Sequence, residues 1–220
     1  MARMRVSRAA LGGALLVLAV INVALLYQGQ RYRTETARLK AGMTSVERAR
    51  AEAIIEADSN RSSLLVQVAR RQSSGDDAVH LAVSSESSFV ALDRGTVRLR
   101  RMSARFGPER RVGVPPDTVW VASPRGLRTV ERQLGAKDRF ELPAWVWGDR
   151  RLPVPSERAG TGWLGAHALV LSGGAVIYSL PAEGPLADSS YVMPGAVRVA
   201  PADLAAIRDN LTGGVRVYFY

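Results

Sequence analysis

The side chains with the most potential for chemistry are concentrated near the C-terminus, within residues 164–220. Three serines in this stretch could supply a nucleophile, namely Ser179, Ser189 and Ser190. A serine needs a base within hydrogen-bond reach to become nucleophilic. The nearest candidate is His167, which lies inside an apolar run, where a lone histidine is typical of a core or strand-surface residue. A serine hydrolase or transferase is therefore only weakly indicated.

The chain contains no cysteine and two histidines, His80 and His167. Without cysteine it has no thiolate nucleophile, no disulfide and no thiolate zinc ligand. Two histidines far apart in the sequence are little material for a metal site. We therefore expect neither a metal nor a cofactor.

Despite the missing thiol, the C-terminal stretch has the layout of a cysteine-enzyme active site. LGAHALVLSGGAVIYSLP (164–181) has the pattern of a strand hairpin, and YVMPGAVRVAPADLAAIRDNLTGGVRVYFY (191–220) that of a turn, a short helix and a final strand. These segments resemble the catalytic domain of the YkuD-type L,D-transpeptidases, enzymes that cross-link peptidoglycan. In that family the hairpin ends in Ile-His-Gly and the second segment carries Ser-His-Gly-Cys-x-Arg. Pro143-Ala144-Trp145 fits the family's Pro-x-Trp segment, Val114-Pro115-Pro116-Asp117 loosely matches its TP-G turn, and the resemblance covers about residues 79–220.

The resemblance places different residues at the family's reactive positions. Tyr178 stands at the first histidine and Ser179 at its glycine, while Met193-Pro194-Gly195-Ala196 stands where Ser-His-Gly-Cys is expected. Gly195 and Arg198 keep the family's residue types, and the interval from Tyr178 to Ala196 fits the family. The predicted vestigial pocket consists of Tyr178, Ser179, Pro194, Gly195, Ala196 and Arg198, and none of them is expected to be catalytic.

The substitutions remove the parts that the family's reaction needs. A cysteine transpeptidase uses a thiolate to attack the carbonyl of a donor stem peptide, and a histidine takes the thiol proton. Ala196 has no nucleophilic atom, and Pro194 cannot act as a base. Tyr178 can donate a hydrogen bond, but a phenol with a pKa of about 10 is a poor base at neutral pH.

Arg198 allows two interpretations. It could form a charge-assisted hydrogen bond to a ligand carboxylate. Alternatively, it pairs with a local acid such as Asp203 or caps a strand end.

The elements that must position these residues begin at residue 78. Short apolar runs separated by turns predict a mainly β fold, an antiparallel or mixed sandwich like that of the L,D-transpeptidases, with one or two short helices. Hairpins are expected at Asp93-Arg94-Gly95 and at Gly173-Gly174. Val97, Leu99 and Met102 are expected to face inward. A short helix is expected from Ala202 to Asn210, because Pro201 suits a first helical turn.

An apolar, uncharged run at residues 9–27 predicts a transmembrane helix. A bilayer core of about 30 Å requires roughly 20 helical residues. The alternative is a cleaved signal peptide, whose apolar region is usually about 7–15 residues and ends in a small-x-small site. Here the run ends in VALLYQGQ, which favours an uncleaved signal anchor. Residues 1–8 then form a cytoplasmic tail, and the C-terminal domain lies in the periplasm or cell envelope.

Residues 28–77 are polar and rich in Ala, Arg and Glu, which predicts a helical stalk or linker before a domain at 78–220. Apolar residues near helical spacing allow a coiled coil and thus a homodimer through the stalk. A solvated helical spacer is the alternative, and the sequence favours neither.

The net charge of +10 is spread along the chain. A nucleic-acid-binding protein more often carries a basic stripe interleaved with aromatic residues. We therefore expect no nucleic-acid partner, and instead a surface compatible with anionic lipids or wall polymers.

Three functions follow as hypotheses. The leading one is a membrane-anchored, envelope-facing pseudoenzyme of the L,D-transpeptidase type, which binds peptidoglycan stem peptides or a cell-wall synthesis partner without catalysis. The second is a structural scaffold working through the transmembrane helix and stalk. The third is an active transpeptidase or hydrolase with a relocated serine nucleophile.

Overall fold

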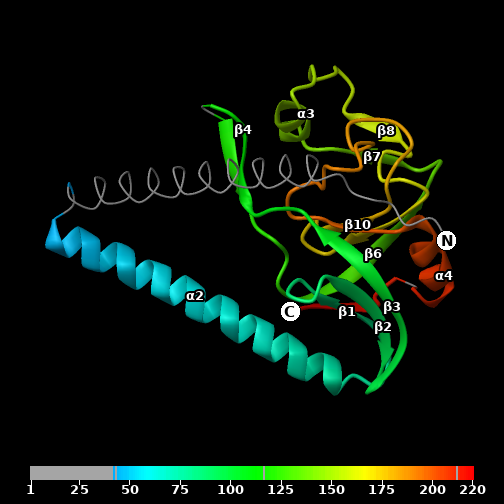
Figure 1. Ribbon diagram of the computed structural model, residues 1–220, viewed down its shortest axis with the longest axis horizontal. Coiled ribbons are helices and arrows are strands. Elements are labelled where there is room, and N and C mark those ends of the chain that lie inside the picture. The colour runs from blue at the N-terminus through cyan, green and yellow to red at the C-terminus, as the bar shows by residue number, and fades with distance from the viewer. Residues whose placement is uncertain (1–41, 43, 116, 212) are drawn as a thin grey trace, which may run out of the picture. The chain divides into compact units, whose positions relative to one another are not determined.

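A computed structural model describes residues 42 and 44–220, except 116 and 212 (Figure 1). The expected tail, the apolar run at 9–27 and the start of the expected stalk lie outside the described residues. No helix within the described part combines the length and apolar character needed to cross a membrane. Residues Asn60–Tyr220 form one compact unit.

The described chain is mainly β with a few short helices after one long helix, as the sequence predicts. Its elements are α2 Ser45–Ser74, β1 Val79–Ser84, β2 Phe89–Arg94, β3 Val97–Phe106, β4 Arg110–Val114, β5 Asp117–Val121, β6 Gly126–Gly135, β7 Arg139–Glu141, α3 Trp145–Arg150, β8 Ala159–Thr161, β9 His167–Leu171, β10 Val176–Tyr178, β11 Val197–Val199, α4 Pro201–Ile207, the 3-10 helix Arg208–Asn210 and β12 Arg216–Phe219.

The main sheet closes into a barrel, whereas the sequence predicted a sandwich. The strand order is β1-β12-β6-β9-β10-β11-β3-β2, and β1 pairs with β2 to close it. Closure depends on β3 and β6, the two ten-residue strands. β6 pairs with β12 and β9, and β3 pairs with β2 and β11. These two strands therefore connect one half of the barrel, β1, β2 and β12, to the other half, β9, β10 and β11. The sheet is mixed, because β1–β12 and β10–β11 are parallel.

The β2–β3 hairpin forms where expected, but its side chains differ from the prediction. Gly95 has φ +57°, a conformation that glycine adopts readily in tight turns. The register shifts between Leu92 and Asp93, which changes the face of the residues nearest the turn. Val97 and Leu99 are exposed, at 59% and 51%, while Met102 is buried as expected. Leu99 lies an odd number of residues from Met102, so the alternation of side chains along a strand places it on the opposite face.

Two apolar clusters share the strands β9 and β10. Leu169, Ile177 and Val197 face the cluster inside the barrel. Their neighbours Ala168 and Tyr178 belong to a second cluster on the outer face. Both faces of these strands are thus covered, which explains why they read as continuous apolar runs. α3, β7 and β8 lie together on one side of the barrel (Figure 1).

The end of α2 is joined to the barrel by a buried polar network. The Asp76 carboxylate accepts hydrogen bonds from the Tyr218 hydroxyl at 2.9 Å and the Ala78 N–H at 3.1 Å, and it pairs with Arg216. Ser73 Oγ lies 3.0 Å from Nε2 of His80, which is fully buried. Because buried polar groups are costly when unpaired, these bonds fix the end of the helix to β1 and β12.

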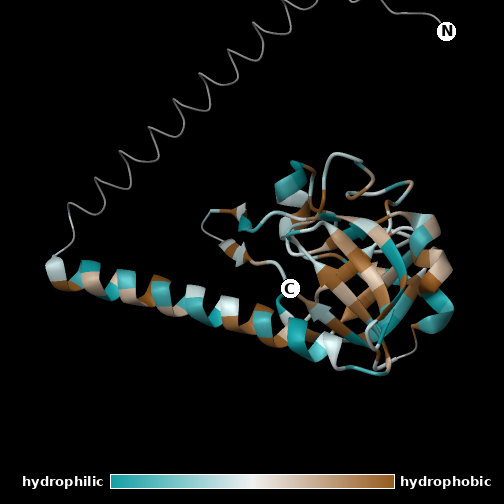
Figure 2. Cartoon of the chain, turned by 60° about the horizontal axis from the view of Figure 1, so that its bottom comes forward, coloured by the Kyte–Doolittle hydropathy of each residue, from teal (hydrophilic) through white to brown (hydrophobic). Residues whose placement is uncertain are grey.

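α2 itself has no continuous apolar face. Hydrophilic and hydrophobic residues are interspersed along it (Figure 2). Val46, Ile54, Ile55 and Leu64 are exposed by 60–68%. The helix expected in the stalk is present over Ser45–Ser74, and its dimerisation stays a prediction.

Candidate functional site

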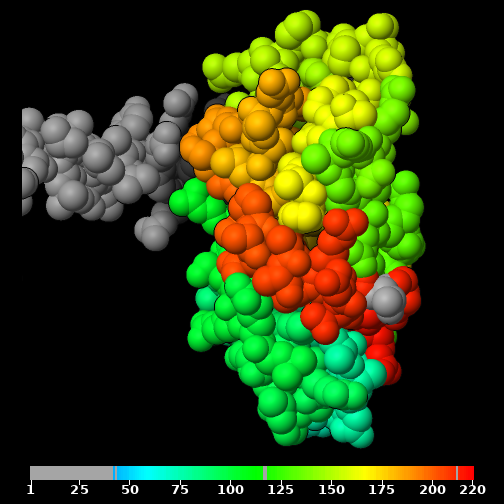
Figure 3. All heavy atoms as spheres, turned by 90° about the vertical axis from the view of Figure 1, so that its right-hand side faces the viewer, coloured from blue at the N-terminus to red at the C-terminus, as the bar shows by residue number. Residues whose placement is uncertain are grey.

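β10 and β11 bring the expected site residues together. Tyr178 and Arg198 are partners in the parallel pairing, and Ala196 directly precedes β11. The exposed fractions are 0% for Tyr178, 2% for Ala196 and 8% for Arg198. The C-terminal segments that carry these residues, orange to red in Figure 3, lie between the green β2–β3 region and the yellow-green region of α3 and β8. The residues share a place, but their side chains are closed off from solvent.

Met193, Pro194, Gly195 and Ala196 form a tight turn before β11. The Ala196 N–H donates to the Met193 carbonyl at 3.0 Å, and Gly195 has φ +71°. Proline followed by a glycine with positive φ matches a type II turn. A Cβ at Gly195 would lie 2.6 Å from Cγ1 of Val121, so both the conformation and the space require glycine. The backbone conformation and the lack of space therefore explain why position 195 is a glycine.

Tyr178 supports this turn. Its hydroxyl oxygen accepts a hydrogen bond from the Met193 N–H at 3.2 Å. Burial raises the pKa of the Tyr178 phenol, and the Met193 N–H and Arg198 oppose this only in part. The phenol therefore stays protonated at neutral pH and cannot act as a base.

Arg198 contacts neither a carboxylate nor a solvent-open space. Its guanidinium donates to the carbonyls of Ser189 at 2.6 Å, Tyr191 at 2.8 Å and Asp188 at 3.3 Å. Arg198 thus fastens the segment before the turn to β11. Asp203, the acid considered as its partner, pairs with Arg100 at 2.8 Å instead.

The serines are not arranged as nucleophiles. Ser179 is fully buried, and its hydroxyl donates to the His167 carbonyl at 3.0 Å and accepts from the His167 N–H at 3.1 Å. These bonds join main chain to side chain and do not involve the imidazole. The Ser190 hydroxyl donates to the Asp188 carboxylate at 2.6 Å. This bond and the hydrogen bond that the Ser190 N–H donates to the same carboxylate lower the pKa of Asp188 to about 2. The Asp188 carboxylate is therefore a very weak base.

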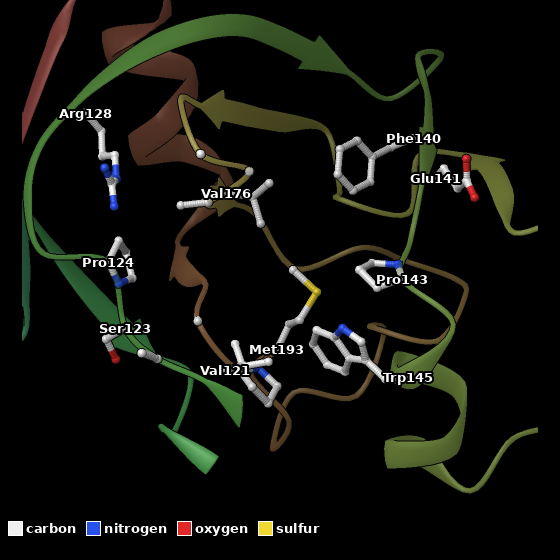
Figure 4. A pocket seen from close by; sticks show the side chains of 16 residues that line it. Val121, Ser123, Pro124, Arg128, Phe140, Glu141, Pro143, Trp145, Val176 and Met193 are labelled. Atoms are coloured by element: carbon white, nitrogen blue, oxygen red, sulfur yellow. The ribbon is translucent and has the colours of Figure 1, made fainter. Parts of the chain in front are cut away.

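An open pocket of about 420 Å³ lies against the Met193–Gly195 turn (Figure 4). Tyr178, Ala196 and Arg198 do not line it. One wall is apolar, and the remaining lining includes two charged residues. The main lining side chains are Val121, Ser123, Arg128, Phe140, Glu141, Trp145, Val176 and Met193.

Sequence reasoning found part of this pocket. The Pro-x-Trp segment, Gly173-Gly174 and the Met193 turn had all been singled out, and all of them line it. Arg128 was missed, because it lies in a polar segment that gave no strand signal and proved to be β6. The residues next to it, Leu127 and Thr129, do not form a clear alternation of apolar and polar side chains, so the sequence did not predict a strand there.

No group of His, Asp or Glu side chains within residues 44–220, leaving aside the two undescribed positions, is arranged to hold a metal ion. The buried His167 Nδ1 has no hydrogen-bond partner in the described structure, but no acid stands beside it to form a relay.

Comparison with known proteins gives matches only among solved structures. No family model and no curated protein matches the sequence. The L,D-transpeptidase of Xylanimonas cellulosilytica matches with 17% identity and a TM-score of 0.45, over 66% of this chain and 61% of that one. L,D-transpeptidase 1 of Mycobacterium tuberculosis matches with 18% identity and a TM-score of 0.42, over 65% and 62%.

A third match is the catalytic domain of an E. faecium L,D-transpeptidase acylated by ertapenem, with 10% identity and a TM-score of 0.44, over 66% of this chain and 98% of that domain. The chain spans about three fifths of the first two structures. All three of these structures are L,D-transpeptidases by name. At such identities and TM-scores, the likeness says nothing about activity or substrate.

Proposed function

We propose that this chain is a membrane-anchored, envelope-facing, L,D-transpeptidase-like protein that binds peptidoglycan stem peptides, or a partner in cell-wall synthesis, without catalysing transpeptidation. The motif spacing between Tyr178 and Ala196 supports the family relationship. The apolar run at residues 9–27 supports the anchor, with the C-terminal domain on the envelope side.

The observation that carries the proposal is the difference between the two sides of the Met193–Ala196 turn, one of which is open to solvent and the other buried. Its outer side lines a pocket of about 420 Å³, a size suited to a small ligand. The residues behind the turn are buried, and the position of the family's nucleophile is Ala196. A site of this kind can hold a ligand but offers no thiolate for an acyl intermediate.

Binding and catalysis can be tested in one experiment. The full chain, in a non-ionic detergent, is incubated with purified peptidoglycan sacculi and then sedimented, and the digested muropeptides are examined by mass spectrometry. We expect co-sedimentation without new cross-links. Formation of cross-linked muropeptides, or a protein that stays in the supernatant, would contradict the proposal.

Two tryptophans provide matched variants. Trp145 lines the pocket, whereas Trp120 is 60% exposed on β5 and does not line it. W145A should weaken co-sedimentation several-fold while W120A leaves it unchanged. Thermal unfolding of both variants separates loss of binding from loss of fold.

The absence of chemistry can be tested by trying to restore it. Incubation with a carbapenem should give no mass increase in the wild type or in A196C, because the thiol in A196C still lacks a histidine base. A triple variant, Y178H/P194H/A196C, restores both family histidines and the cysteine. A carbapenem adduct on the wild-type chain would exclude a non-catalytic role.

The scaffold function is a second candidate, favoured by the exposed apolar side chains Ile54, Ile55 and Leu64 of α2. An I54E/I55E variant distinguishes the two functions. It should lose a protein partner but keep co-sedimentation with sacculi if α2 is the scaffold surface.

A further inference from the structure

The charges around the pocket are not balanced. Its lining contains two charged side chains, Arg128 and Glu141. Glu141 pairs with Arg158 at 2.9 Å, so its charge is compensated. The side chain of Arg128 makes no hydrogen bond or ion pair with any residue that the structure describes. The pocket therefore presents one uncompensated positive charge.

The free cation lies at one end of the pocket. Arg128 shares that side with Ser123, whose hydroxyl also has no partner among the described residues, and Glu141 lies on the opposite side (Figure 4). Phe140, Trp145 and Met193 lie between them and offer apolar surface. Such a site matches a ligand with an anionic end and an apolar body.

The position of Arg128 depends on the neighbouring hairpin turn. Gly173 has φ +78°, and a Cβ there would lie 3.7 Å from the Arg128 Cζ. The guanidinium thus packs close to a turn without side chains, where a ligand can reach it. A half-buried arginine can bind a carboxylate with two parallel hydrogen bonds, which makes it a better carboxylate anchor than a lysine.

We infer that Arg128 is the specificity-determining residue of this pocket, which binds the free terminal carboxylate of a short peptide, with Ser123 as a second donor and the Phe140–Trp145–Met193 wall holding the aliphatic part. This inference rests on the proposed function and names the feature of the peptide that is recognised. The guanidinium acts as an anchor, and no bond is made or broken.

The test uses isothermal titration of the full chain in a non-ionic detergent with two probes, N-acetyl-D-alanyl-D-alanine and its C-terminal amide. They differ only in the terminal group, which is an anionic carboxylate in the first and a neutral amide in the second. The free acid should bind about tenfold more tightly than the amide, the effect of one charge-assisted contact. In R128Q this preference should disappear, and R128K should keep part of it. Raising the salt concentration should weaken binding of the acid only.

The matched control is R132Q, which removes an exposed arginine from the same strand outside the pocket. It should retain the tenfold preference. Equal binding of acid and amide to the wild type, persistence of the preference in R128Q, or binding of neither probe would each overturn the inference. Co-sedimentation with sacculi is measured separately. The two assays therefore distinguish a wrong assignment of the pocket's ligand from a failure of the chain to bind peptidoglycan.

Discussion

The two sides of the Met193–Ala196 turn contain similar residue types used in opposite ways. Behind the turn, the Arg198 guanidinium donates to three backbone carbonyls and the Tyr178 hydroxyl accepts a backbone N–H. In front of it, Arg128 has no partner in the described structure. Polar groups behind the turn stabilise the fold, whereas the polar group in front is available to a ligand. Loss of each group should therefore be seen in a different measurement.

The largest expected effect is on stability behind the turn. R198M removes the guanidinium that donates to three carbonyls and should lower the free energy of unfolding by about 3 kcal/mol. Arg105 also donates to the Ser189 carbonyl, at 3.1 Å, but it is exposed, so R105M should cost about 0.5 kcal/mol. Urea denaturation measures both. Equal losses would mean that burial does not distinguish the two arginines.

The turn itself should give the next largest effect. G195A adds a Cβ 2.6 Å from Val121 at a positive φ and should cost about 2 kcal/mol. Gly174 has a similar φ but no atom within 4 Å of a Cβ, so G174A isolates the backbone strain at about 1 kcal/mol. Equal losses of stability in the two variants would mean that Val121 moves aside and that its contact with the new Cβ adds nothing to the cost of G195A.

Y178F should cost about 1 kcal/mol at pH 7, because the Met193 N–H loses its acceptor. The raised pKa of Tyr178 adds a pH dependence. Stability from a raised pKa is fully present below the unfolded-state value of about 10 and is lost as pH rises through the folded value. The difference between wild type and Y178F should therefore shrink above pH 10, as urea titrations at pH 8 to 11 can show. A constant difference would contradict the role of burial.

The smallest effect is expected in front of the turn. R128M should change the free energy of unfolding by less than about 0.5 kcal/mol, because it removes no side-chain hydrogen bond or ion pair within the described structure. The same denaturation series measures it. A loss similar to that of R198M would show that Arg128 is structural and would end the contrast between the two sides.

Local features of this fold could be read from the sequence. The turns at Gly95 and Gly173-Gly174 and the helix beginning at Pro201 depend on residues close together in the chain, and all three form. The family spacing also grouped Tyr178 with Ala196 and Arg198, and β10 and β11 bring these residues together. These predictions required no knowledge of distant contacts.

Features that depend on distant contacts could not be predicted. β6 was overlooked because much of it is polar, yet it joins both halves of the barrel. Val97 and Leu99 are exposed, although their residue types favour burial. Arg198 has carbonyl partners, and a backbone carbonyl carries no mark of its role in the sequence.

Barrel closure also limits how another protein could attach. A strand at the edge of a sheet can accept a strand from a partner, but each of the eight barrel strands described here has neighbours on both sides. Among the described elements, strands with a neighbour on one side only occur in the two-stranded sheets β4–β5 and β7–β8. Within the barrel, β3 and β6 pair with one neighbour along one stretch and with the other neighbour along the next. β-augmentation, and with it edge-to-edge aggregation, is therefore expected first at those two small sheets rather than at the barrel.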